Sequence, residues 1–190
     1  MTDFRTAGSI GERVQAARKA RGMSARQLAE AIGGVPTQST IENIELGRKA
    51  AIDIVQLLNL AMALRVPLSY LLAPMGLPDS RLDLPGLSGE FGSMTSNEFD
   101  AWLASVPDGA RIPTSLDERN AVSELHALRA WKAKTSEIAR LETAAQLEKA
   151  GNEVGEEGHQ PPIEVRLRDV RREAERLAAF LRAAGWPIRD

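Results

Sequence analysis

The chain has 190 residues, 43% hydrophobic and 26% charged, which suits one or two small domains with apolar cores. It contains no cysteine, which excludes disulfides, thiolate metal sites and a cysteine nucleophile, and which favours a reducing compartment. The sequence has neither the pattern of a secretory signal nor an apolar run of about 20 residues that could span a membrane. We therefore expect a cytoplasmic protein with no membrane segment.

Charge is distributed unevenly along the chain. Residues 1–75 carry nine basic and six acidic side chains, residues 76–160 carry eight and fifteen, and residues 161–190 carry seven and five. A basic N-terminal unit is steered toward phosphates if its positive charges share one face. The alternative is that these charges form an ordinary solvated surface.

Short helices are predicted in the first 75 residues, each bounded by capping residues or glycine. A capping box of Ser9 and Glu12 begins the first helix, and Ser24, Thr37 and Asp53 cap the next three, while Pro67 fits the first turn of the fifth. The predicted helices are residues 10–20, 25–32, 38–46, 54–64 and 68–72. Their core-facing positions are predicted to be Ile10, Val14, Ala17, Leu28, Ile32, Ile41, Ile44, Leu46, Ile54, Leu57, Leu58, Ala61 and Leu64. This pattern indicates an all-α domain with one shared core.

The third predicted helix, QSTIENIEL, has an unusually narrow apolar stripe. Ile41 and Ile44 anchor it, which leaves Gln38, Ser39 and Asn43 on the outside together with Glu42. An α-helix fits the major groove of DNA, where amide and hydroxyl side chains hydrogen-bond to base edges. The competing interpretation is a solvated helix with no partner.

The order of these segments resembles a known family of regulators. The stretches IGERVQAARKARGMSARQLAEAIGG, TQSTIENIELGRK and DIVQLLNLAMALRVPLSYLL are similar to the helix-turn-helix domain of lambdoid phage repressors and Cro proteins, the XRE type, across residues 10–72. The resemblance implies that Arg18 of the first helix pairs with Glu45 at the end of the third. Three positions depart from the family pattern: Ala25 replaces a phosphate-contacting glutamine, the turn GGVPT is two residues longer, and Ile52 replaces a proline.

The resemblance assigns DNA-contacting roles to two sets of residues. Candidates for reading bases are Gln38, Ser39, Thr40 and Asn43. Candidates for binding the DNA backbone are Ser24, Arg26, Thr37, Arg48 and Lys49. Glu42 could accept a hydrogen bond from a cytosine amine, or it could face solvent and repel phosphate.

The remainder of the chain is predicted to be a connector followed by long helices. Residues 75–114 are rich in proline and glycine and contain one short helix, EFDAWLASV, begun by Ser96 or Asn97 before a PDG turn. A capping box of Ser115 and Glu118 opens a long helix to Ala150, and residues 163–181 carry a heptad seam. That seam consists of Ile163, Leu167, Val170, Ala174, Leu177 and Leu181.

These long helices either fold back on each other or pair with a second copy of the chain, and the sequence favours the dimer. A monomer would need further DNA contacts, for which Arg166, Arg168, Arg171 and Arg172 are candidates. The predicted domains are residues 1–74, 75–114 and 115–190.

Motifs for catalysis or metal binding were sought without success. His126 and His159 have no metal-ligand companion at helical spacing, and the acidic linker with Glu153, Glu156 and Glu157 fits a solvated charge cluster. We therefore expect no enzyme activity, no cofactor and no metal.

The expected function is sequence-specific binding of double-stranded operator DNA by a phage-type or prophage-type repressor that forms a homodimer. An antirepressor or a toxin is a possible protein partner. Three alternatives are an antitoxin that regulates its own operon, a regulator with a ligand pocket between its C-terminal helices, and a helical interaction protein that does not bind DNA.

Overall fold

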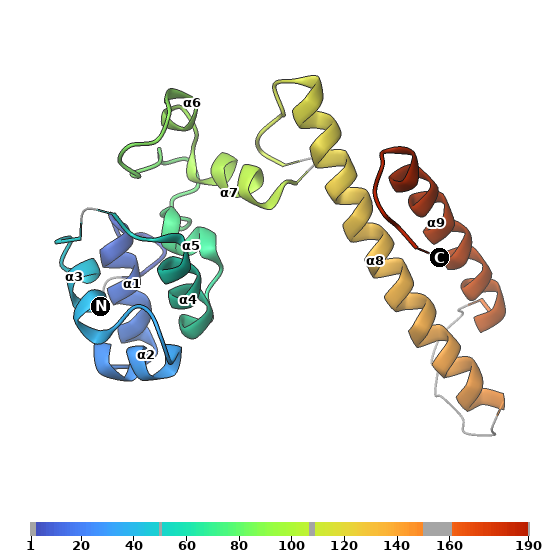
Figure 1. The fold of residues 1–190 in the computed structure, drawn as a ribbon, viewed down its shortest axis with the longest axis horizontal. Coiled ribbons are helices and arrows are strands. Elements are labelled where there is room, and N and C mark those ends of the chain that lie inside the picture. The colour runs from blue at the N-terminus through green and yellow to red at the C-terminus, as the bar shows by residue number, and fades with distance from the viewer. Residues whose placement is uncertain (1–2, 50, 107–108, 150–160, 190) are drawn as a thin grey trace. The chain divides into compact units, whose positions relative to one another are not determined.

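The computed structural model describes residues 3–49, 51–106, 109–149 and 161–189 (Figure 1). Within these ranges the regular structure is helical, apart from an isolated bridge between Arg81 and Thr95. The helices are α1 (Ile10–Ala20), α2 (Ala25–Ile32), α3 (Gln38–Glu45), α4 (Ile54–Leu64), α5 (Leu68–Leu72), α6 (Gly89–Gly92), α7 (Ser96–Ala104), α8 (Leu116–Lys149) and α9 (Ile163–Ala183). The all-α prediction is confirmed. No helix in the described ranges combines the length and the apolarity needed to cross a membrane.

Contacts divide the chain into two compact units. The first contains residues 1–104 and 109–111, and the second contains residues 105–108 and 112–190. Residues 75–104 therefore pack with the N-terminal helices. The predicted boundaries at residues 74 and 114 stay predictions, and the predicted PDG turn and the acidic linker with His159 fall mostly outside the described residues.

One hydrophobic core joins α1 to α5, as the sequence predicts. It is formed by Val14, Ala17, Leu28, Ile41, Ile44, Leu57, Leu60, Ala61, Leu64 and Leu71. Each of the five helices contributes at least one of these side chains, so none of them has to be stable alone. The helices are held as a set around α1 and α4.

The caps of α1 to α4 are the predicted residues Ser9, Ser24, Thr37 and Asp53, but two predicted capping boxes differ in detail. Ser9 accepts a hydrogen bond from the Glu12 amide, whereas the Glu12 carboxylate reaches one residue further back, to the amide of Gly8. Glu118 similarly binds the amide of Thr114 rather than that of its cap. A complete reciprocal box occurs at α2, where the Ser24 hydroxyl accepts from the Gln27 amide and the Gln27 side chain accepts from the Ser24 amide.

The inward face of α4 differs from the prediction. Ile54 and Leu58, predicted to be core residues, are 59% and 48% exposed, while Leu60 is fully buried. The sequence IVQLLNLAMAL has no charged residue, so its periodicity does not distinguish the inner face from the outer one. Leu46 was also expected to face inward, but it is the C-cap residue of α3 and is 57% exposed.

A fully buried arginine ties three separate segments to this core. The Arg13 side chain has 0% exposure, and it donates hydrogen bonds to the carbonyl oxygens of Ala7, Leu71 and Leu72. Its two terminal nitrogens also bind both carboxylate oxygens of Asp83, at 2.8 and 3.0 Å. The N-terminal segment, the end of α5 and the connector are thereby fixed to α1.

The connector contains an ordered aromatic cluster and a short helix, α6, that the sequence did not predict. The rings of Phe91 and Trp102 meet edge to face at 4.9 Å between centroids, and Phe99 lies beside both. Phe99 is 4% exposed. Thr95 caps α7 through a reciprocal box with Glu98. The connector as far as residue 104 therefore contains ordered, packed structure and belongs to the first unit.

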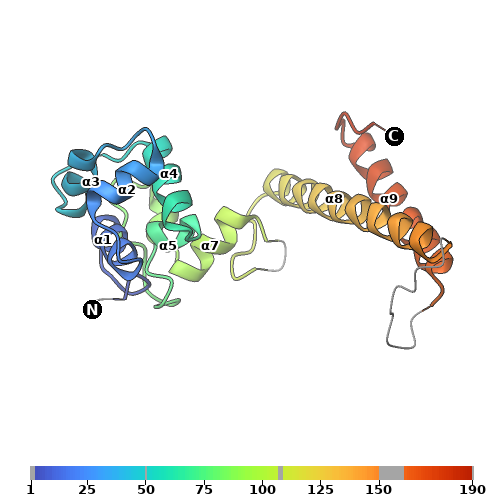
Figure 2. The same ribbon diagram turned by 90° about the horizontal axis from the view of Figure 1, so that it is seen from below.

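In the second unit α8 and α9 form an antiparallel hairpin, and Figures 1 and 2 both show them side by side. The indole of Trp186, beyond α9, donates to Glu124 near the start of α8, while Arg171 binds Glu142 further along. The seam side chains Ile163, Val170, Ala174 and Leu181 are buried. The heptad seam is thus covered within one chain, which is the hairpin alternative, and the favoured homodimer stays a prediction. Periodicity identifies a face that needs a partner, but it does not identify the partner.

Replacing Arg13 by methionine should lower the free energy of unfolding by about 3 kcal/mol, because methionine keeps the bulk but leaves the Asp83 carboxylate and three carbonyl groups without their donor. Urea denaturation of the full chain measures this loss. Arg5→Met is the matched control, since Arg5 pairs with Asp3 at the surface and its loss should barely move the midpoint. Equal midpoints for the two variants would show that the buried network does not stabilise the unit.

Candidate nucleic-acid interface

Helix α3 is attached to the domain by its inner face and by a very close approach to α1. Ile41 and Ile44 are 0% and 2% exposed. A Cβ atom at Gly11 of α1 would lie 2.2 Å from the carbonyl oxygen of Ile44, much closer than real Cβ contacts. Only glycine fits at position 11 with the two backbones at this distance. The sequence analysis did not single out this glycine.

An ion pair fixes the C-terminal end of α3. Two nitrogens of Arg18 each lie 2.6 Å from a carboxylate oxygen of Glu45, and the third donates to the carbonyl of Met23. The side chains are only 12% and 4% exposed, and the Glu45 hydrogen bond is the main cause that raises the pKa of Arg18 above its usual value. The structure thus brings together the two residues that the family resemblance paired, and Gln15 adds a 3.4 Å contact to the same carboxylate.

The predicted base-reading residues of α3 differ in their exposure to solvent. Gln38, Ser39 and Asn43 are exposed, whereas Thr40 is half-buried. The hydroxyls of Ser39 and Thr40 lie 3.2 and 3.0 Å from the hydroxyl of Thr37, the N-cap residue, which also accepts a hydrogen bond from the Thr40 amide. Thr37 and Thr40 are therefore occupied largely in starting the helix.

Gln38 and Glu42 interact with each other on that face. The Gln38 amide nitrogen donates to a carboxylate oxygen of Glu42 at 2.9 Å. Their spacing of four residues is a signal present in the sequence, because side chains at i and i+4 are neighbours on a helix. Asn43 makes no side-chain hydrogen bond in the part of the chain that the structure describes.

The predicted backbone-binding residues are distributed around α2 and the end of α3. Arg48 and Lys49 follow α3 and form no ion pair with any described residue. Arg26 instead pairs with Glu30 at 2.8 Å on the exposed side of α2. Ser24 is engaged as the N-cap, although its hydroxyl proton remains free to donate. Arg48 and Lys49 are thus the cations most available to a phosphate.

The longer turn between α2 and α3 is fastened to α4. Gly33 ends α2 in the left-handed conformation with φ of 71°, and the Val35–Pro36 peptide bond is cis. Pro36 is buried, and the Asn59 amide donates to the Val35 carbonyl at 2.7 Å. The turn is thereby attached to the domain at Val35 and Pro36.

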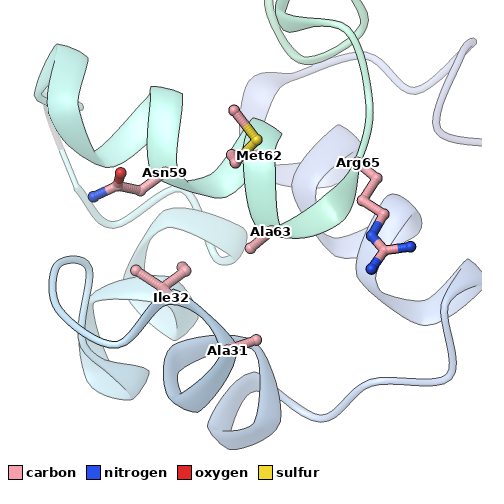
Figure 3. A pocket seen from close by; sticks show the side chains of 6 residues that line it. All are labelled: Ala31, Ile32, Asn59, Met62, Ala63 and Arg65. Carbon is pink, nitrogen blue, oxygen red and sulfur yellow. The ribbon is translucent and has the colours of Figure 1, made fainter.

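A groove of about 320 Å³ lies between the end of α2 and α4. Figure 3 shows Ile32 on one side and Ala63 on the other. The lining residues are Ala31, Ile32, Asn59, Met62, Ala63 and Arg65. Met62 is 80% exposed, and no acid or histidine lines the groove, so it offers no pair of groups for acid–base chemistry.

The C-terminal arginines are largely engaged with neighbouring acids. Arg171 binds Glu142 across the hairpin, and Arg168 and Arg172 both lie within 4 Å of Asp169. They form a mixed-charge surface rather than a uniformly basic one. Among the described residues, no group of three or more acidic or histidine side chains is placed to hold a metal ion.

The geometry defines a helix-turn-helix DNA-binding domain: two helices joined by a fixed turn, the second presenting polar side chains outward. Comparison with known families agrees, because a family model described as helix-turn-helix matches residues 14–71. The match supports an XRE-type helix-turn-helix in residues 14–71 and, with it, a role in DNA-binding transcription regulation. Comparisons with curated proteins and with solved structures gave no match.

Replacing Glu45 by alanine should lower the free energy of unfolding by about 3 kcal/mol, because the nearly buried Arg18 guanidinium loses its counter-ion. Thermal unfolding followed by circular dichroism measures the effect. Glu30→Ala provides the control, since it removes an acid from an exposed pair on α2 and should leave the melting temperature almost unchanged. A melting temperature that stays at the wild-type value in Glu45→Ala would contradict a stabilising role for the pair.

Proposed function

We propose that the protein is a sequence-specific regulator of the phage or prophage repressor type, which binds double-stranded operator DNA by inserting residues 37–46 into the major groove. The observation that carries the proposal is the rigid attachment of α3 combined with its exposed polar face. Gly11, Arg18 and Glu45 fix the helix, while Gln38 and Asn43 remain exposed. Such a protein acts in the cytoplasm, at the chromosomal DNA.

The side chains divide into readers and anchors. Gln38, Ser39, Thr40 and Asn43 have the donor and acceptor groups that distinguish base pairs in the major groove. The hydroxyls and cations that would hold the sugar-phosphate backbone are Ser24, Arg26, Thr37, Arg48 and Lys49. Backbone contacts position the helix, whereas base contacts supply the preference for one sequence.

Gln38→Ala and Asn43→Ala should each weaken binding to the preferred sequence by about 1 to 3 kcal/mol and relax the preference at single base pairs. Arg48→Ala should instead weaken binding to all sequences to a similar extent, because a phosphate contact carries no sequence information. Fluorescence anisotropy with preferred and scrambled duplexes separates the two classes. Wild-type affinity and preference in all three variants would rule out α3 as the reading element.

We further propose that the protein dimerises through its C-terminal hairpin. A two-helix hairpin buries one face of each helix, and on α8 only Ala127 and Leu141 are buried among the described residues. Leu125, Leu128 and Trp131 are half-buried. Two such hairpins can cover each other's faces as a four-helix bundle. Dimerisation would also bring two recognition helices to half-sites about one DNA turn apart.

Sedimentation velocity of the full-length protein at micromolar concentration should therefore give the mass of a dimer, and the preferred DNA should contain two related half-sites. Met62→Lys is the control for association through α4, because Met62 is exposed on that helix. This variant should still sediment as a dimer. A monomer that binds one asymmetric site would contradict this part of the proposal.

One observation favours a second candidate, an antitoxin that regulates its own operon. A groove of about 440 Å³ in the hairpin is lined by Asn120, Ser123, Glu124, Phe180, Ala183 and Ala184. Phe180 is 47% exposed, so an apolar side chain of a partner protein could cover it. Stoichiometric copurification of a second chain from the native host would favour the antitoxin, while a helical interaction protein without DNA binding would retard no duplex.

A further inference from the structure

We propose that Glu42 is a positioning residue that sets the direction of the Gln38 amide, and that it thereby lets α3 distinguish an A·T base pair from the reversed T·A pair. This inference rests on the proposed reading of the major groove by α3. It assigns Glu42 a role in specificity without any contact to a base.

The argument begins with the chemistry of the two groups. A carboxylate only accepts hydrogen bonds, whereas an amide has a donating nitrogen and an accepting oxygen. The 2.9 Å hydrogen bond therefore requires the Gln38 nitrogen to face Glu42 and directs the oxygen away from it. Turning the amide over would place two oxygens against each other and would lose a hydrogen bond to a charged acceptor.

The direction of the amide decides which base pair it matches. Glutamine recognises adenine by donating from its nitrogen to N7 and accepting at its oxygen from the N6 amine. Across the major groove the T·A pair presents the same groups in the opposite order, so it matches the reversed amide. Fixing one direction selects one orientation of the base pair.

Among the side chains around Gln38, Glu42 is the one that can fix the direction of its amide. The neighbouring hydroxyls of Thr37, Ser39 and Thr40 bond among themselves and to the helix start. A hydroxyl both donates and accepts, so none of these groups could impose a single direction on an amide. Glu42 is the acidic side chain one turn further along the exposed face of α3.

The test compares base preference in Glu42→Gln with that of the wild-type chain. A glutamine at position 42 can donate as well as accept, so both directions of the Gln38 amide become available. A preferred duplex is first selected from a random library with the full-length wild-type protein, and anisotropy then gives affinities for all four base pairs at each position. The position read by Gln38 is the one where Gln38→Ala abolishes the preference.

At that position the wild-type chain should prefer A·T over T·A by about tenfold or more, since a hydrogen bond to a charged group separates the two directions of the amide. In Glu42→Gln this ratio should fall to about twofold, and in the Gln38→Ala, Glu42→Gln double variant it should match Gln38→Ala alone. Glu30→Gln is the matched control, because it removes one acid from an exposed i, i+4 pair on α2 and should keep the wild-type ratio.

Two results would overturn the inference while leaving the proposed function intact. One is an unchanged ratio in Glu42→Gln at a position where Gln38→Ala abolishes the preference. The other is a loss of preference caused by Glu42→Gln that persists when Gln38 is alanine, since Glu42 would then contact a base itself. Failure of the wild-type chain to select any sequence would instead overturn the proposed function, and this inference with it.

Discussion

The burial of the Arg13 guanidinium constrains the first unit more than any other single interaction. A buried charge needs both a counter-ion and an acceptor for each of its N–H groups, and no single segment here provides them all. The acceptors come from Ala7, from the end of α5 and from Asp83, which lies 70 positions along the chain from Arg13. The DNA-binding unit consequently includes the N-terminal segment and the connector as well as α1 to α5.

Two further contacts hold the N-terminal segment in place. Phe4 lies against Tyr70 with 6.0 Å between ring centroids, and the carbonyl of Arg5 accepts from the Gly76 amide at 2.7 Å. These contacts attach the segment before α1 to α5 and to the residues just after it. The residues before α1 and the residues after α5 are therefore bound to each other as well as to Arg13 of α1. Helix α1, to which α3 is attached, is held by both.

Sequence patterns predicted the features that depend on local spacing. The caps, the helix boundaries and the narrow stripe of α3 follow from residues a few positions apart, and they agree with the structure to within a residue or two. The Arg18–Glu45 pair came from the family resemblance. By contrast, Asp83, the counter-ion of Arg13, has no periodic relation to it, and α4 has no charged residue to mark its outer face. The hairpin seam was found correctly, but its partner is α8 of the same chain.

The exposed side of α3 was only partly predictable, because its side-chain hydrogen bonds depend on rotamers as well as on spacing. The spacing of Ile41 and Ile44 placed Gln38 and Asn43 on the outer face. It did not indicate that the Ser39 and Thr40 hydroxyls would turn toward the hydroxyl of the Thr37 cap. Those outcomes depend on rotamers and on competition among neighbours, which a linear sequence does not determine.

The close contact at Gly11 makes the packing of α3 independent of the side chains proposed to read DNA. The atom that Gly11 approaches is the backbone carbonyl of residue 44, which every amino acid has, and no outward side chain of α3 takes part. Residues 38, 39 and 43 can therefore be exchanged without altering how closely the two helices fit. A new operator preference can arise by substitution on the outer face alone, through evolution or by design, whereas almost any change at position 11 would alter the geometry with which every sequence is read.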